Sequence, residues 1–435
     1  MLFTGSGCNL DHRSKKDEGS SSSQTTTDKN SIKYLISSDI DYRNELSEGR
    51  YGYNVVSVSG DRENVEYSQY RFMKTGIKEE SSETANSNAA ISAENGASPT
   101  ITNSLIITEG TEAFGILSYG IGTNVDISDS VITTRLDSSD GLLSASNGDI
   151  NAVHVTVETQ GNYSSAVYAE TGGGAVIDRG SYTTLGKNSP VLHSAASISV
   201  MNARLTSKAS QAVVIEGRNS AVLENCEINA NHNDRNSTDP LHFQAVLIYQ
   251  PDNDSTITGK SKFSSSGGTL TNSNGDIFFV TNTAADITLE NTDIINEDTS
   301  GKFLRAEESI WGTSGNNGGK INLNANNQLI QGDIIVDNSS ILNFYMTSDS
   351  AFSGALNRNN SEGKIYVEIS SGSKWVLTGN SYITSLTCQT DSVNLNGYTL
   401  YVNGILYVSG TSSSGNAIDF DSSGDSGLIE EEGKE

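Results

Sequence analysis

The sequence contains little cysteine and little basic charge, and it has no long apolar run. With only 3 cysteines, and with Cys226 and Cys388 far apart in the chain, a disulfide framework is not expected. No stretch approaches the roughly 18 consecutive apolar residues that a membrane-spanning helix requires. Lysine and arginine number 27 against 53 acidic residues, a formal net charge of −26. Nucleic acid is therefore not an expected partner, because binding to phosphates depends on basic patches.

Proline and charged residues are also scarce, with 4 prolines and a charged fraction of 18%. A disordered chain typically has more charge or more proline, and it lacks regularly spaced aliphatic residues. A length of 435 residues would ordinarily suggest two or three globular domains. A solenoid grows in one dimension, however, so a single long solenoid domain accommodates this length.

The most regular feature of the sequence is a short motif of an aliphatic residue, a spacer, a turn-forming residue and a second aliphatic residue three positions later. The motif recurs at Ile101-Asn103-Ile106, Ile127-Asp129-Ile132, Val200-Asn202-Leu205, Leu223-Asn225-Ile228 and Leu289-Asn291-Ile294. Weaker copies are centred on Ala152, Arg179 and Gly259. Successive copies lie roughly 23 to 34 residues apart, which is the period of a stacked repeat.

The two aliphatic residues of each copy are separated by an odd spacing, which a straight strand would place on opposite faces. Asn and Asp tolerate the left-handed backbone conformation, so a bend at Asn103 directs Ile101 and Ile106 into one interior. The next residue is small in most copies, as expected where a corner narrows the interior: Ser104, Ser130, Gly180, Ala203, Cys226 and Thr292. Each copy therefore predicts two short strands that meet at a corner.

Alternating runs such as Val213-Val214-Ile215-Glu216 predict a further strand in each repeat. Because every coil travels the same way round, stacked coils form parallel ladders. The expected fold is all-β, a single-stranded parallel β-helix of about twelve coils. Right-handed winding is expected from the general preference for right-handed crossovers.

Composition divides the chain into five predicted parts. A Ser/Thr-rich linker with a lipoprotein-like start covers 1–30, and an amino-terminal cap with the first coil covers 31–80. The β-helix coils occupy 81–324, the carboxy-terminal coils and cap occupy 325–408, and an acidic disordered tail covers 409–435.

The segment Gly5-Ser6-Gly7-Cys8 and the polar stretch after it resemble the end of a bacterial lipoprotein signal peptide. The resemblance implies that Cys8 carries a lipid anchor, which would be the chain's link to a membrane. The alternative is a plain disordered amino terminus.

The carboxy-terminal third contains Gly332-Asp333-Ile334, Ser350–Gly354, Gly372–Ser381 with its Trp-x-Leu-Thr-Gly-x-Ser sequence, and Leu395–Leu400. These segments resemble the last coils of pertactin-like autotransporter passengers and related bacterial surface β-helix adhesins. Upstream of about residue 325 the chain is similar only in a general way to pectate-lyase-like β-helices. The resemblance implies an extracellular, bacterial cell-surface location and an adhesive or structural role. Trp375 is expected to fill the interior of a late coil.

The outward residues of the best-defined ladder form two predicted columns. The first holds Ser118, Ser144, Tyr168, His193, Val214, Leu247, Phe279 and Arg305, and the second holds Ser146, Glu170, Ala195, Glu216, Tyr249, Thr281 and Glu307. Exposed aromatic rings beside carboxylates suit sugars, which have apolar faces and hydroxyl edges. The candidate ligand-binding residues are Tyr168, Glu170, His193, Glu216, Leu247, Tyr249, Phe279, Arg305 and Glu307.

Three interpretations of this face stay open. A loop covers Leu247 and Phe279, or the face is an adhesion groove for a glycan or a host surface protein, or it is the catalytic cleft of a polysaccharide lyase or glycoside hydrolase. The sequence has no recognisable motif for either enzyme, so no catalytic residue is predicted. The expected function is non-enzymatic, adhesin-like binding by a monomer, and a surface spacer without a ligand is a further alternative.

No cofactor and no metal site are predicted, because the histidines lack metal-site spacing. Acidic corners at 234–239 and 252–254 could hold Ca²⁺ through oxygen ligands, although turn formation explains them more simply.

Overall fold

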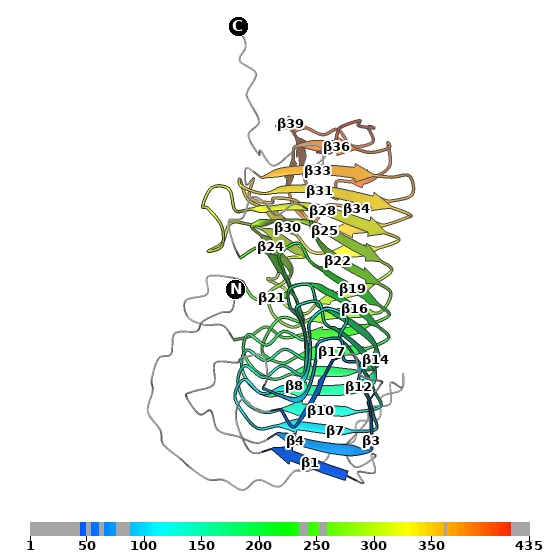
Figure 1. The fold of residues 1–435 in the computed structure, drawn as a ribbon. Coiled ribbons are helices and arrows are strands. Elements are labelled where there is room, and N and C mark those ends of the chain that lie inside the picture. Colours follow the sequence, from blue (N-terminus) through cyan, green and yellow to red (C-terminus); the bar gives the residue numbers. More distant parts are fainter. Residues whose placement is uncertain are drawn as a thin grey trace. The chain divides into compact units, whose positions relative to one another are not determined.

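The computed structural model describes residues 44–48, 54–60, 65–74, 88–234, 242–251, 259–360 and 363–418. All of them belong to one unit, Tyr34–Glu435. The predicted linker at 1–30 and the predicted anchor Cys8 lie outside the described residues. The described chain is all-β and winds as a parallel β-helix, as predicted, with strands stacked in sequence order from β1 to β36 (Figure 1).

Sheet B is one wall of the helix and contains 11 strands in the described part of the chain. Its members are β2 (Val56–Ser59), β5 (Ala89–Glu94), β8 (Phe114–Tyr119), β11 (Leu142–Ala145), β13 (Val167–Ala169), β15 (Leu192–Ser194), β18 (Val213–Glu216), β21 (Gln244–Tyr249), β24 (Asp276–Thr281), β27 (Leu304–Ala306) and β30 (Ile334–Val336). A parallel bridge from Ile334 to Leu356 continues this wall by one level.

Sheet A contains two ladders that meet along the line of corners. The ladder before the corner is formed by β3 (Glu66–Ser68), β6 (Thr100–Thr102), β9 (Asn124–Ser128), β16 (Ser197–Met201), β19 (Ser220–Glu224), β22 (Ser261–Ser266), β25 (Thr283–Glu290), β28 (Gly319–Asn326), β31 (Ile341–Thr347), β33 (Lys364–Ile369) and β36 (Ser385–Thr387). The ladder after it is formed by β1 (Asn44–Glu48), β4 (Tyr70–Lys74), β7 (Leu105–Thr108), β10 (Val131–Thr134), β17 (Arg204–Ser207), β20 (Glu227–Ala230), β23 (Thr269–Asn272) and β26 (Asp293–Asn296). Two long strands, β12 (Asp149–Thr159) and β14 (Gly174–Thr184), run through the corner and join the ladders into one sheet.

Two small sheets complete the carboxy-terminal coils. Sheet C consists of β29 (Leu329–Gln331), β32 (Ala351–Ser353), β34 (Lys374–Val376) and β37 (Val393–Asn394). Sheet D consists of β35 (Ser381–Ile383), β38 (Leu400–Val402) and β39 (Ile405–Leu406). Strand β39 pairs with β38 in the antiparallel direction.

The corners adopt the predicted left-handed backbone. The φ angles at Asn103, Asp129, Asn202, Asn225 and Asn291 lie between 47° and 55°, and both aliphatic neighbours of Asn103 are fully buried. The small residues after the corners form hydrogen bonds inside the wall: the Ser104 backbone N–H donates to Ser130 Oγ at 3.0 Å. The predicted motif therefore marks the turn that sends both aliphatic residues inward.

Two weaker copies of the motif are placed wrongly by the sequence. Val153 pairs with Ser128 and Thr156 pairs with Val131, so the corner of that coil is His154 and not Ala152. His154 has a φ of 55°, and its Nδ1 lies 2.9 Å from Asp129 Oδ1 of the preceding corner. The imidazole can thus form the local hydrogen bond that favours left-handed backbone in Asn and Asp.

The second misplaced corner is that of Gly259. Ser266 pairs with Glu224 and Thr269 pairs with Glu227, so Gly267 and Gly268 occupy the corner instead. Both have positive φ, at 65° and 70°, which glycine adopts without steric cost. An insertion in the preceding coil lengthened the spacing and concealed this position.

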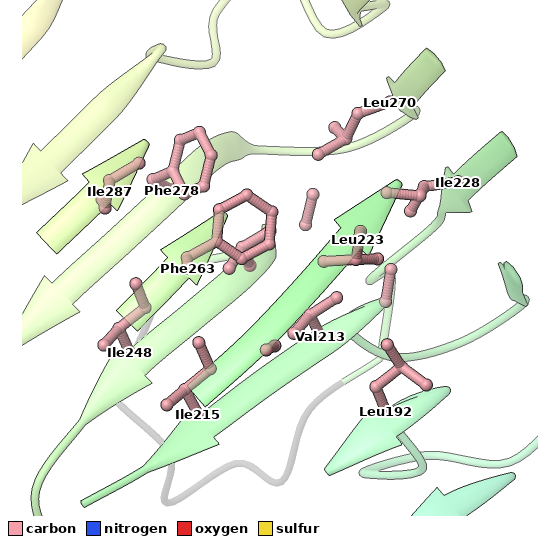
Figure 2. Close-up of a cluster of buried hydrophobic side chains, with 14 of the residues drawn as sticks. Leu192, Val213, Ile215, Leu223, Ile228, Ile248, Phe263, Leu270, Phe278 and Ile287 are labelled. Atoms are coloured by element: carbon pink, nitrogen blue, oxygen red, sulfur yellow. The ribbon is translucent and has the colours of Figure 1, made fainter. Parts of the chain in front are cut away.

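The interior is a continuous column of aliphatic and aromatic side chains. Figure 2 shows a section in which Val213 and Ile215 of β18, Ile248 of β21 and Phe278 of β24 project toward side chains of the opposite ladders. Each fully buried aliphatic or Phe side chain contributes roughly 1.5 to 3 kcal/mol relative to exposure. Trp375 is fully buried as predicted, and its Nε1–H donates to the Gly354 carbonyl at 3.0 Å.

The carboxy-terminal segment extends the described chain beyond the predicted coil boundary at 408. Ser413 and Cys388 exchange two backbone hydrogen bonds, of 2.9 and 3.0 Å. Asn343 Nδ2 donates to the Ile418 carbonyl at 2.6 Å. Residues 409–418 of the predicted tail are therefore held against β36 and β31, and 419–435 lie outside the described residues.

We expect the loss of stability on substitution of a corner asparagine to depend on the left-handed backbone conformation more than on side-chain polarity. Asn103 is exposed with a φ of 47°, so Asn103→Val should destabilise the chain by about 1–2 kcal/mol, because a β-branched residue disfavours left-handed backbone. Asn103→Gly should change stability by less than about 0.5 kcal/mol. Urea unfolding followed by circular dichroism measures both. Equal losses of stability in Asn103→Val and Asn103→Gly would contradict a requirement for left-handed backbone at this corner.

Candidate functional site

The outer face of sheet B carries the candidate residues, and its register corrects the start of both predicted columns. Leu143 pairs with Tyr168 and with Leu117, so these leucines stand in the first outward column, whereas Ser118 and Ser144 are buried with Ala169 in the inward one. In the second column, Ala145 takes the place predicted for Ser146, because Ala145 directly follows the inward residue Ser144. In the earlier coils this inward position holds small buried residues, polar or not, such as Ser118, Ser144 and Ala169, whereas later coils place Ile215 and Ile248 there. A polarity argument therefore put the serines outside.

Five side chains from five different coils form one connected network on this face, which we term the aromatic–carboxylate network: Tyr168, His193, Glu216, Tyr249 and Trp311. The rings of Tyr168 and His193 are stacked, with centroids 4.4 Å apart and an interplanar angle of 7°. The rings of Tyr249 and Trp311 are 4.1 Å apart and tilted by 33°. Glu216 joins the two aromatic pairs.

Glu216 Oε2 is the atom that makes this connection. It lies 3.1 Å from His193 Nε2 and accepts a hydrogen bond of 3.1 Å from the Tyr249 hydroxyl. Burial alone would raise the pKa of Glu216, but the hydrogen bonds from His193 and Tyr249 and the charge of His193 outweigh it, so the pKa is lowered. Glu216 therefore stays ionised, with its other oxygen, Oε1, as a further acceptor.

Exposure differs along the network. The side chains of His193 and Glu216 are 20% and 21% exposed, and Tyr168 and Trp311 are also partly exposed. Tyr249 is buried at 4%. Burial and the neighbouring Glu170, Glu216 and Asp140 carboxylates raise the pKa of Tyr168, so its phenol stays protonated and can donate a hydrogen bond. The accessible part of the network is thus a set of ring surfaces beside one ionised carboxylate.

The apolar centre of the face is packed and not open. Leu247 is 4% exposed and Phe279 is 1% exposed, and both belong to a cluster with Val214 and Tyr249 against which Trp311 packs. This burial agrees with the interpretation in which a loop covers Leu247 and Phe279. The predicted ligand-binding role of these two residues would have to be indirect, through support of Tyr249 and Trp311.

Arg305 and Glu307 form a second polar cluster, further along the same face. Arg305 Nε donates to Asp276 Oδ2 at 2.6 Å and Nη1 donates to Glu307 Oε1 at 2.9 Å, while Glu307 Oε2 lies 3.3 Å from His242 Nε2. Burial acts to lower the pKa of Arg305, but Asp276 and Glu307 raise it by a larger amount. The guanidinium is therefore fixed in its charged form between two carboxylates.

Asp140 is a buried carboxyl group next to the network, 7% exposed, whose Oδ1 accepts a 2.6 Å hydrogen bond from the Ser165 backbone N–H. Burial raises its pKa to about 7, with Glu170 adding to the rise and Ser165 and His193 opposing it. Glu170 follows β13 and is partly exposed. No sequence pattern points to Asp140, because it lies just before β11 and outside the alternating columns.

Trp311 is the other residue that sequence reasoning missed. It lies in the loop between β27 and β28, and it is one of only 2 tryptophans in the chain. That rarity was the available signal. The Asn317 side chain fixes the loop by donating from Nδ2 to the Ser309 carbonyl at 2.7 Å and to the Trp311 carbonyl.

Within the described ranges, no three His, Cys, Asp or Glu side chains are grouped so as to hold a metal ion. The acidic corner at 252–254 lies outside the described residues, as does 235–239. Cys226 and Cys388 are free thiols and buried, and burial raises the pKa of Cys226. The described part of the chain contains no helix that could span a membrane.

Comparison with known proteins gives no match: no family, no curated protein and no solved structure is similar to this chain. The assignment of the chain as a parallel β-helix therefore depends on its strand register.

Stability should depend on the ionisation of Asp140. An acid whose pKa is raised in the folded state stabilises the fold at pH below its unfolded value, near 4, and this contribution is lost as pH rises through about 7. Asp140→Asn keeps the acceptor for Ser165 without the charge, so the variant should match the parent near pH 4 and exceed its stability near pH 8 by up to about 4 kcal/mol. Urea unfolding across this pH range measures the difference. A difference that stays constant with pH would contradict the assignment.

Proposed function

We propose that this chain is a non-enzymatic binding protein that recognises a saccharide through the aromatic–carboxylate network. The observation that carries the proposal is the placement of ionised Glu216 between two aromatic pairs, with Tyr168, His193 and Trp311 partly exposed around it. Sugar rings pack their C–H faces against aromatic rings and donate hydroxyl hydrogens to carboxylates.

Rigidity of the network supports this proposal. Each member comes from a different coil and is held by the strand ladder or, for Trp311, by Asn317, so little side-chain freedom remains to be lost on binding. Leu247 and Phe279 belong to the same buried cluster as Tyr249, against which Trp311 packs, and so support the aromatic pair.

The setting we propose is the exterior of a bacterial cell, with the chain displayed as a monomer and anchored through Cys8. The pertactin-like segments near Trp375 and the acidic composition support an adhesin-like role toward a glycan or a host surface protein. In this role the β-helix would present the network at a distance from the membrane.

A glycan array followed by calorimetry on the best ligand tests the proposal. Tyr168→Ala and Trp311→Ala should each weaken binding at least tenfold, about 1.4 kcal/mol, through loss of aromatic contact. Tyr398→Ala removes a tyrosine that is 41% exposed near β38 and should leave the affinity unchanged. If the array and host-cell binding are both blank, the binding proposal is wrong and a spacer role is favoured.

A polysaccharide-cleaving enzyme is the second candidate, and the contrast between Asp140 and Glu216 favours it. Their environments shift the two pKa values in opposite directions, which is the pattern of a general acid and a base, and both carboxyl groups interact with His193. Against a lyase, Arg305 is held protonated by Asp276 and Glu307 and cannot serve as a base.

Product release distinguishes the two candidates. The binding proposal predicts that the purified chain, incubated with acidic or neutral polysaccharides and calcium, forms no reducing or unsaturated ends. Release that is abolished by Glu216→Gln and by Asp140→Asn would replace binding with catalysis. If both variants still release such ends, the release comes from a contaminating enzyme.

A further inference from the structure

A basic hollow lies where the chain turns from sheet B into sheet A, next to the aromatic–carboxylate network. It has a volume of about 540 Å³ and is bordered by Gly172, Gly173, Ser197, Arg218, Lys260 and Lys262, among others. This volume falls within the roughly 300–1,000 Å³ of small-molecule binding sites. The lining spans the starts of β14, β16, β19 and β22, so the hollow crosses several coils.

The charge of the hollow is opposite to that of the chain. Three of its ten lining residues are basic and none of these described lining residues is acidic, although acidic residues outnumber basic ones by 53 to 27 in the sequence. Arg218 Nη1 donates to the Gly259 carbonyl, and Lys260 Nζ, on a side chain that is 14% exposed, lies 3.4 Å from Asp286 Oδ1, so both cations are held in place beside the hollow. Lys262 is exposed.

Neutral donors stand beside these cations. The hydroxyls of Ser197 and Ser220 are 3.3 Å apart on adjacent coils, in the same column as Lys262. At Gly173 a Cβ atom would come within 2.6 Å of the Ser144 carbonyl oxygen, so no side chain can occupy that part of the corner. The result is an open recess with hydroxyl and cationic groups, which suits a carboxylate or sulfate group.

The recess lies close to the network along the chain and is hydrogen-bonded to its backbone. Arg218 follows Glu216 by two residues, and Asn219 Nδ2 donates to the Glu216 carbonyl at 2.6 Å. The Gly217 backbone N–H donates to the Tyr249 carbonyl at 2.8 Å. A ligand longer than one sugar could therefore contact both places at once.

We infer that the saccharide is anionic, with a carboxylate or sulfate group held in the basic hollow by Arg218, Lys260 and Lys262 while a neighbouring ring contacts the aromatic–carboxylate network. This inference depends on the proposed saccharide binding and names its ligand class. Since the net charge of the chain repels polyanions, a local basic recess is the feature that would make such a ligand preferred.

The test measures binding of polygalacturonate, dextran sulfate and neutral dextran to the full chain by calorimetry at low and at physiological salt. At least one acidic polymer should bind tenfold or more tightly than neutral dextran, with an affinity that falls as salt rises. The Arg218→Gln, Lys262→Gln double variant should lose that preference at least tenfold. Lys208→Gln changes an exposed lysine of a distant corner and is the matched control.

The outcomes separate this inference from the proposed function. If no saccharide binds the parent chain, the proposed function fails and the inference fails with it. If saccharides bind but acidic and neutral ones do so equally, or if the double variant binds like the Lys208→Gln control, only the inference is overturned. Inorganic sulfate binding as tightly as the polymers would also overturn it, by showing a general anion site. The single variant Lys262→Gln, at an exposed position, provides the same comparison if the double variant is poorly folded.

Discussion

Left-handed backbone at one corner of each coil is the constraint on which the rest of this structure depends. Without it, Ile101 and Ile106 would point to opposite sides of a strand, and the chain could not bury both. With it, every coil contributes inward pairs on two walls, and the column of buried side chains in Figure 2 continues from coil to coil. The parallel registers of sheets A and B follow, because each corner repeats at the same point of its coil.

The same regularity explains why a site forms on the outer face of sheet B. Neighbouring strands place Tyr168, His193 and Val214 in direct register, although they are more than twenty residues apart in sequence. Side chains from adjacent coils therefore meet at fixed separations, as the stacked rings of Tyr168 and His193 do. Glu216 becomes a bridge because its column lies beside theirs.

The fold was predictable in detail because the residues that recur once per coil, mainly Asn and Asp, favour one backbone conformation. Asn103 and Asn225 mark corners whatever surrounds them, whereas His154 and Gly267 fill the same place for reasons that a spacing count does not detect. Ser118 and Ser144 show the limit of polarity as a guide, since both are fully buried at the inward position that Ile215 and Ile248 occupy in later coils. Tyr168, His193, Glu216 and Tyr249 were found as members of outward columns. Trp311 and Asp140 were not, because loops position them and loops do not follow the period.

The reversed direction of β39 at the carboxy-terminal end has a consequence for assembly. Tyr401 and Val402 of β38 pair with Leu406 and Ile405 of β39, so β38, the last parallel strand of sheet D, already has an antiparallel neighbour. A second copy of the chain could not continue sheet D with a parallel strand unless β39 were first displaced. The antiparallel pairing of β39 thereby opposes end-to-end addition of a second copy through sheet D, an inherent hazard of any protein built by repeating one parallel step.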